Sequence, residues 1–173
     1  MKIAVVGAHG TGKTTVCREI AKKLKYNYIP DIVAEAFRLK FTINEETPPE
    51  SQFWILSKQI ELERNTPSPW IMEKSLWDNV VYGSFSIKDK EVLSVIQKIV
   101  DANAKYDLVF YLPIEFPIPD DGLRSLNADF QKFVDGKLLE YLKSHAIKYH
   151  TLTGDNDKRV NSAVKIIRKL KSS

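Results

Sequence analysis

The chain of 173 residues contains a single cysteine, Cys17, and therefore cannot form an internal disulfide. We expect Cys17 to act as a small buried hydrophobe in a protein of the reducing cytoplasm. No apolar stretch approaches the roughly 20 residues that a membrane-spanning helix needs, so we expect no signal peptide and no membrane anchor. These absences exclude a small scaffold stapled by disulfides and argue against a membrane protein.

Two kinds of recognition motif are also missing. His145 and His150 have no metal-ligand spacing with any cysteine cluster, so the sequence gives no support to a zinc site. An Asn-Lys-x-Asp segment, by which switch GTPases recognise guanine, is absent as well, which argues against that class and for ATP. Hydrophobic residues make up 43% of the chain and charged residues 28%, with no break in composition. We therefore expect residues 1–173 to form one domain.

What the chain does contain is a complete phosphate-binding loop. Residues 7–14 read G-A-H-G-T-G-K-T, with two glycines, a lysine and a threonine at the offsets of a P-loop. A β-branched run at 2–6 precedes it, and helical periodicity at 15–25 follows it. In this arrangement backbone N–H groups surround the phosphates, Lys13 reaches their outer oxygens and Thr14 binds Mg²⁺. We predict an ATP and Mg²⁺ site with these contacts: Gly7, His9 (through its backbone), Gly10, Thr11, Gly12, Lys13, Thr14 and Thr15.

Strands are expected to alternate with helices along the whole chain. Apolar runs predict strands at 2–6, 27–30, 70–73, 107–112 and 147–152. Helical periodicity predicts helices at 15–25, 31–40, 50–65, 75–82, 89–104, 127–144 and 156–170. We expect Asp31 to cap the second helix. The alternation predicts an α/β protein of three layers, with a parallel sheet between helices.

Two charged residues, Glu73 and Lys74, stand at the carboxyl end of the expected third strand. Ligands gather at this edge of parallel sheets. An acid beside a P-loop can hold Mg²⁺, and a neighbouring cation can contact phosphate. We therefore predict that Glu73 is a metal ligand and that Lys74 binds substrate, with an exposed surface pair as the alternative.

Three further charged residues are candidates for catalysis or substrate binding. Glu35 and Arg38 lie one helical turn apart, where Glu35 could accept the proton of an attacking hydroxyl and Arg38 could bind an anionic substrate group. An exposed ion pair fits the same spacing. Arg124 belongs to the connection 113–125, which is long enough to be functional, and could close over the γ-phosphate from a lid. A plain surface turn explains that segment equally well.

Taken in order, four motifs resemble a known family. They are G-x-x-x-x-G-K-T-T at 7–15, A-E-A-F-R at 34–38, E-K-S-x-x-D-x-x-x-Y at 73–82 and D-D-G-L-R-S at 120–125. The succession is similar to that of the P-loop proteins, often labelled AAA-type ATPases, that include the nicotinamide riboside kinase domain. It is similar, more distantly, to deoxynucleoside and thymidylate kinases. The resemblance implies a three-layer P-loop fold whose five-stranded parallel sheet has the order 2-3-1-4-5, with a lid loop near 113–125.

The resemblance also implies roles for individual residues. Glu35 would sit where such kinases place a catalytic base or an acceptor-binding acid, and Arg124 would be the lid arginine. Arg159, in the segment after the last strand, would lie near the adenine. Trp54 would lie on the helix that lines the site of a small-molecule acceptor.

These motifs predict an ATP- and Mg²⁺-dependent kinase that acts on a nucleoside, a nucleotide or a related ribose-containing metabolite. Two alternatives stay open. Relatives usually carry Asp-Arg where this chain has Glu73-Lys74, and lysine cannot make arginine's two-pronged contact with phosphate. That departure would suit a slow NTPase or a regulatory module with a protein partner. The net charge of +4, with basic residues gathered at 22–25 and 165–171, would suit a kinase that acts on a nucleic-acid end.

Overall fold

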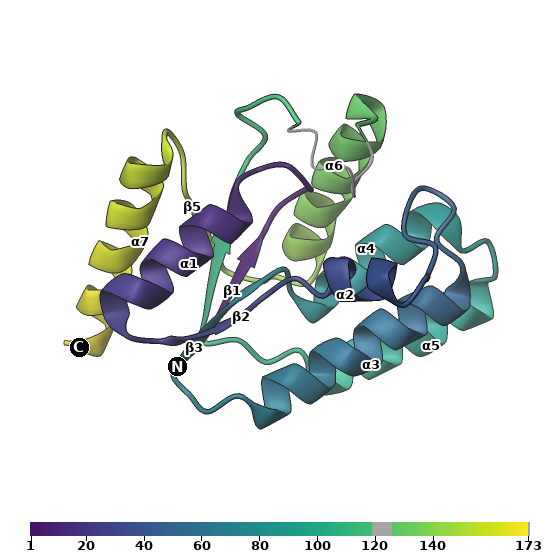
Figure 1. The fold of residues 1–173 in the computed structure, drawn as a ribbon, viewed down its shortest axis with the longest axis horizontal. Helices are drawn as coiled ribbons and strands as arrows, with labels where there is room; N and C mark the ends of the chain where they lie inside the picture. Colours follow the sequence, from purple (N-terminus) through teal and green to yellow (C-terminus); the bar gives the residue numbers. More distant parts are fainter. Residues whose placement is uncertain (119–125, 173) are drawn as a thin grey trace.

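Figure 1 shows the computed structural model of the chain, which describes residues 1–118 and 126–172. Within these ranges five parallel strands form one sheet in the order β2-β3-β1-β4-β5, which confirms the expected topology. The strands are β1 (Lys2–Val6), β2 (Asn27–Ile29), β3 (Trp70–Glu73), β4 (Leu108–Tyr111) and β5 (His150–Thr151). Because all five run in parallel, their carboxyl ends lie at one edge of the sheet.

Helices cover both faces of this sheet. Those in the described part of the chain are α1 (Lys13–Leu24), α2 (Val33–Arg38), α3 (Pro49–Asn65), α4 (Leu76–Ser86), α5 (Lys90–Asn103), α6 (Ala128–Ser144) and α7 (Asn156–Lys171). Each lies where the periodicity predicts a helix, but some bounds differ. α1 begins inside the P-loop, because the N–H of Val16 already bonds to the carbonyl of Gly12. β5 is shorter than the expected 147–152, because this edge strand pairs only with β4.

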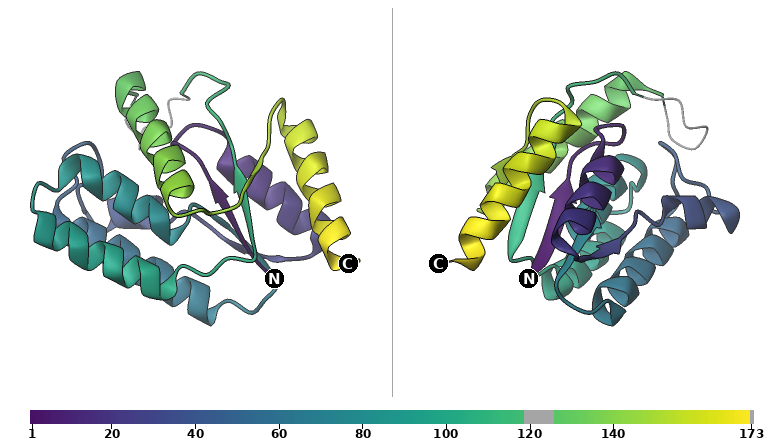
Figure 2. Two further views of the ribbon diagram at one scale, coloured as in Figure 1. Left: turned by 180° about the vertical axis from the view of Figure 1, so that it is seen from behind. Right: turned by 60° about the vertical axis from the view of Figure 1, so that its left-hand side comes forward.

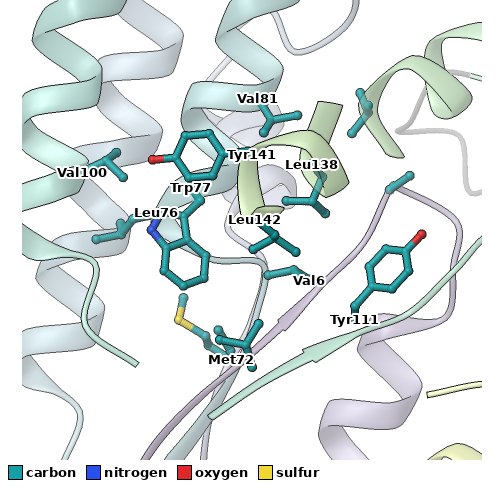
Figure 3. Close-up of a cluster of buried hydrophobic side chains, with 14 of the residues drawn as sticks. Val6, Met72, Leu76, Trp77, Val81, Val100, Tyr111, Leu138, Tyr141 and Leu142 are labelled. Atoms are coloured by element: carbon teal, nitrogen blue, oxygen red, sulfur yellow. The ribbon is translucent and has the colours of Figure 1, made fainter. Parts of the chain in front are cut away.

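Successive residues of the central strand point to opposite faces and enter two separate cores. Ala4 and Val6 pack in the core formed with α3, α4, α5 and α6, whereas Ile3 and Val5 pack in the core formed with α1 and α7. Figures 1 and 2 show α1 and α7 side by side on one face of the sheet. Figure 3 shows part of the larger core, whose labelled members include Met72, Trp77, Val81, Leu138, Tyr141 and Leu142.

Burial on both faces explains the composition of the strands. Every residue of β3 and β4 is buried, as expected of a parallel sheet between two helical layers. Cys17 is buried in the smaller core, as its sequence predicts, and burial raises the pKa of its thiol. In the parts of the chain that the structure describes, no helix is long and apolar enough to cross a membrane.

Candidate active site

The P-loop connects the carboxyl end of β1 to the amino end of α1. Gly12 stands before the first residue of α1 with a φ of 87°, a left-handed conformation that glycine adopts without strain. The side chain of Lys13 turns back into the loop, where its Nζ donates hydrogen bonds to the carbonyls of Gly7 (2.8 Å) and Ala8 (2.5 Å). The predicted order of strand, loop and helix is therefore present, with the lysine ammonium held inside the loop.

Side chains from α6 and α7 hold the backbone of this loop. Gln131 of α6 donates to the carbonyl of His9 (2.6 Å), and Arg159 of α7 donates to the carbonyl of Thr11 (2.7 Å). Arg159 is fully buried, and its other terminal nitrogen binds the Glu115 carboxylate at 2.6 Å. That hydrogen bond lowers the pKa of Glu115. The loop is thus fixed from two helices through its carbonyl groups.

Thr14 and Glu73 meet beside the P-loop. The hydroxyl of Thr14 donates to one carboxylate oxygen of Glu73 at 2.5 Å, and the hydroxyl of Tyr28 donates to the other. Glu73 itself is only 3% exposed. A hydroxyl and a carboxylate are oxygen donors of the kind that Mg²⁺ prefers, with phosphate oxygens and water as its other ligands. The pair therefore fits the metal that the sequence predicts at these two residues.

The next residue, Lys74, forms an ion pair across the end of the sheet. Its Nζ lies 3.3 Å from a carboxylate oxygen of Asp31 and 4.8 Å from the centroid of the Tyr82 ring. Asp31 directly follows β2 and Pro30, and its second carboxylate oxygen accepts a hydrogen bond from the N–H of Val33 at the start of α2. The ion pair thus joins the carboxyl ends of β2 and β3 at the place where α2 begins.

These charged residues line a cleft beside the P-loop. The cleft encloses about 770 Å³, a size typical of sites for small molecules. His9, Asp31, Glu73 and Lys74 lie at the side next to the P-loop and the strand ends. The remaining walls come from the segment after α2 and from α3, α4 and α6, with apolar lining by Ile32, Val33, Ile43, Ile55 and Phe130.

The wall formed by α3 and α4 carries two facing amides. Asn79 donates from Nδ2 to Oε1 of Gln59 at 3.1 Å. The other two buried amide atoms, Nε2 of Gln59 and Oδ1 of Asn79, have no hydrogen-bond partner among the described residues. Burying such groups without a partner is costly. A ligand that offers an acceptor and a donor side by side would complement this pair.

Asp78 fixes the turn that leads from β3 into α4. One of its carboxylate oxygens accepts hydrogen bonds from the N–H (2.7 Å) and the hydroxyl (2.8 Å) of Ser75. Burial raises the pKa of Asp78, and the positive charges of Lys74 and Lys13 oppose that rise. The turn that presents Lys74 to the cleft is therefore held by a buried carboxylate that also lines the cleft.

The structure brings some of the predicted residues into the cleft and leaves others outside it. His9, Glu73 and Lys74 line it, and His9 does so with its imidazole ring, whose centroid lies 5.5 Å from that of Phe130. The sequence predicted a contact through the His9 backbone alone. Arg159, predicted near the adenine, is buried against the loop backbone instead of facing the cleft.

Four other predicted residues are not part of the cleft lining. Glu35 and Arg38 lie on α2 beyond the turn that carries Asp31, and Arg38 is exposed. Trp54 stacks on Phe41, with ring centroids 4.9 Å apart. Arg124 falls outside the residues that the structure describes.

The cleft also contains residues that the sequence did not single out as functional. Asp31 was read as a helix cap, although its place just after a strand, at the ligand-binding edge of a parallel sheet, is a signal that could have identified it. Gln59 and Asn79 belong to no motif. Their pairing depends on the packing of α3 against α4 and has no local signature.

The fold and the site together define a P-loop protein with the architecture of nucleoside and nucleotide kinases. The family described as "AAA domain" matches residues 2–159, and the chain belongs to this family. No curated protein matches the sequence.

Several solved structures have a similar fold. NadR protein in complex with NR is 20% identical with a TM-score of 0.80; the match covers 97% of this chain and 50% of that one, so this chain spans about half the length of the NadR chain. Deoxyadenosine kinase from M. mycoides with bound dCTP is 21% identical over 100% of both chains, with a TM-score of 0.69. Thymidylate kinase from Candida albicans is 16% identical, with a TM-score of 0.72 over 98% of this chain and 92% of that one.

The buried position of Arg159 leads to a test of the contact between α7 and the P-loop. Arg159→Ala leaves the Thr11 carbonyl and the Glu115 carboxylate without their partner, so we expect the free energy of unfolding to fall by about 3 kcal/mol and ATP to bind more weakly. Arg168→Ala, at an exposed position on the same helix, should change stability by less than about 0.5 kcal/mol. Urea unfolding and titration with an ATP analogue measure both effects. Equal stability of the two variants would show that the contact contributes nothing.

Proposed function

We propose that the chain is an ATP- and Mg²⁺-dependent kinase, with residues 1–173 acting as one domain. It would transfer the γ-phosphoryl group to a hydroxyl of a nucleoside, a nucleotide or a related ribose-containing metabolite. The observation that carries this proposal is the cleft beside the P-loop, where Asp31, Glu73 and Lys74 stand next to the loop that would hold the phosphates. An NTPase uses water as its acceptor and needs no such cleft. The fold shared with NadR, deoxyadenosine kinase and thymidylate kinase supports the same class.

On the donor side, the N–H groups of the P-loop and the Lys13 ammonium would hold the β- and γ-phosphates. Thr14 and Glu73 would hold Mg²⁺, which supplies positive charge against the β- and γ-oxygens. The family resemblance assigns Arg124 to a lid over the γ-phosphate and places Arg159 near the adenine. Since the Arg159 guanidinium is bonded to the Thr11 carbonyl, we assign it the further role of holding the loop in shape.

On the acceptor side, we assign Asp31 as the carboxylate that orients the acceptor hydroxyl and takes its proton. The hydroxyl oxygen forms a bond to the γ-phosphorus, the bond from that phosphorus to the β–γ bridging oxygen breaks, and ADP leaves with the electron pair. Lys74, paired with Asp31, would contact the transferred group. Glu35, farther along α2, is the alternative base that the sequence proposes. Positioning and electrostatics would supply most of the acceleration.

Charge-neutral substitutions can separate the two candidate bases. Asp31→Asn keeps an oxygen for the N–H of Val33 but removes the negative charge, so we expect kcat to fall by at least about 100-fold with KM for ATP nearly unchanged. Glu35→Gln removes the same charge from the same helix outside the cleft and should keep kcat within about threefold. Steady-state kinetics at saturating acceptor measure both. The reverse ranking would assign the base to Glu35.

The reaction class itself is tested by turnover of Mg²⁺ and ATP with a panel of acceptors. The panel holds nucleosides, nucleotides, vitamin ribosides and oligonucleotides with a 5′-hydroxyl. We expect ADP to form only with an acceptor and in equal amount to a phosphorylated product. ADP release at the same rate with and without every acceptor would contradict a kinase and support an NTPase module.

A further inference from the structure

The charges that line the cleft bear on the kind of acceptor that fits it. Three buried carboxylates line it, those of Asp31, Glu73 and Asp78. Among the described residues that line the cleft, Lys74 is the only lysine or arginine. Even when Glu73 is assigned to the metal, two carboxylates face one ammonium. The described walls therefore carry no excess of positive charge.

The ammonium of Lys74 is also engaged within the protein. It lies 3.3 Å from Asp31 and over the ring of Tyr82. To bind a second anion it would have to share itself with the Asp31 carboxylate, whose side chain is only 8% exposed. The other basic group of the lining, the imidazole of His9, packs against the ring of Phe130.

A phosphate group on the acceptor would meet unfavourable surroundings here. A phosphate monoester carries a charge of about −1.5 to −2 at neutral pH. Proteins bind such groups through arginine forks, several lysines or free backbone N–H groups, since a like charge nearby in a region of low dielectric is repulsive. A nucleoside, in contrast, brings hydroxyls that carboxylates can accept from, and a base that the neutral amides of Gln59 and Asn79 can bind.

We infer that the acceptor is an unphosphorylated nucleoside, with a neutral or cationic base, and that a nucleoside monophosphate is excluded by the charge of the cleft. This inference rests on the proposed kinase function and narrows it. The product is then the nucleoside monophosphate, which would leave the acidic cleft more readily than it could rebind.

Binding of matched pairs in the presence of Mg²⁺ and a non-hydrolysable ATP analogue tests the inference without any turnover. The pairs are adenosine and AMP, thymidine and dTMP, and nicotinamide riboside and its mononucleotide. Isothermal titration should show, for at least one pair, binding of the nucleoside and at least about tenfold weaker binding of its monophosphate. Tighter binding of the monophosphate, or binding of neither member of any pair, would overturn the inference.

A charge variant tests the physical cause. Asp31→Asn releases Lys74 from its carboxylate, so the preference for nucleoside over monophosphate should shrink by about tenfold. Glu50→Gln removes an exposed negative charge from the first turn of α3, away from the cleft, and should leave the preference unchanged. An unchanged preference in Asp31→Asn would overturn the electrostatic explanation.

Turnover with the same pairs separates a failure of this inference from a failure of the proposed function. Conversion of monophosphates to diphosphates would refute the inference and leave the kinase assignment intact. Nucleosides that bind selectively, but are never phosphorylated, would support the acceptor class and refute the kinase assignment.

Discussion

The pairing of β3 with both β1 and β2 is the constraint on which the site depends. The register places Glu73 opposite Val5, near the end of β1, so its carboxylate reaches Thr14 at the start of α1. On the other side, Met72 pairs with Ile29, and the residues that follow these strands bring Lys74 to Asp31. Hydrogen bonding between strands thus joins the phosphate loop to the acceptor cleft. A shift of register in β3 would separate the predicted metal ligands and break the ion pair together.

Buried charges in this protein are consistently satisfied, and their partners connect distant parts of the chain. The Glu73 carboxylate accepts from two hydroxyls, and the Arg159 guanidinium binds a loop carbonyl and the carboxylate of Glu115. Removing one member of such a set leaves the others buried without partners, which costs more than the contact itself contributes. The unpaired atoms of Gln59 and Asn79 differ from this pattern, and we assign them to the acceptor for that reason.

Local patterns predicted the P-loop, the alternation of strands and helices and the role of Glu73 and Lys74 at a strand end, because each depends on contiguous residues. The order of the strands came from the family resemblance, since periodicity carries no information on which strands are neighbours. Spacing pointed to Glu35 and Arg38, whereas Asp31 lies in the cleft, because the strand end and not the helix face determines which residue reaches Lys74. Gln59 and Asn79 meet only when α3 packs on α4, a contact between positions 20 residues apart that no local pattern records.

The central claim is that the P-loop and the cleft are two halves of one active site, occupied by donor and acceptor at the same time. A dinucleoside polyphosphate that joins adenosine to the accepted nucleoside tests this claim most directly. If the two sites face each other as described, one molecule should bind per chain and displace both ATP and the nucleoside in competition titrations. Displacement of ATP alone, with the nucleoside still bound, would contradict the account.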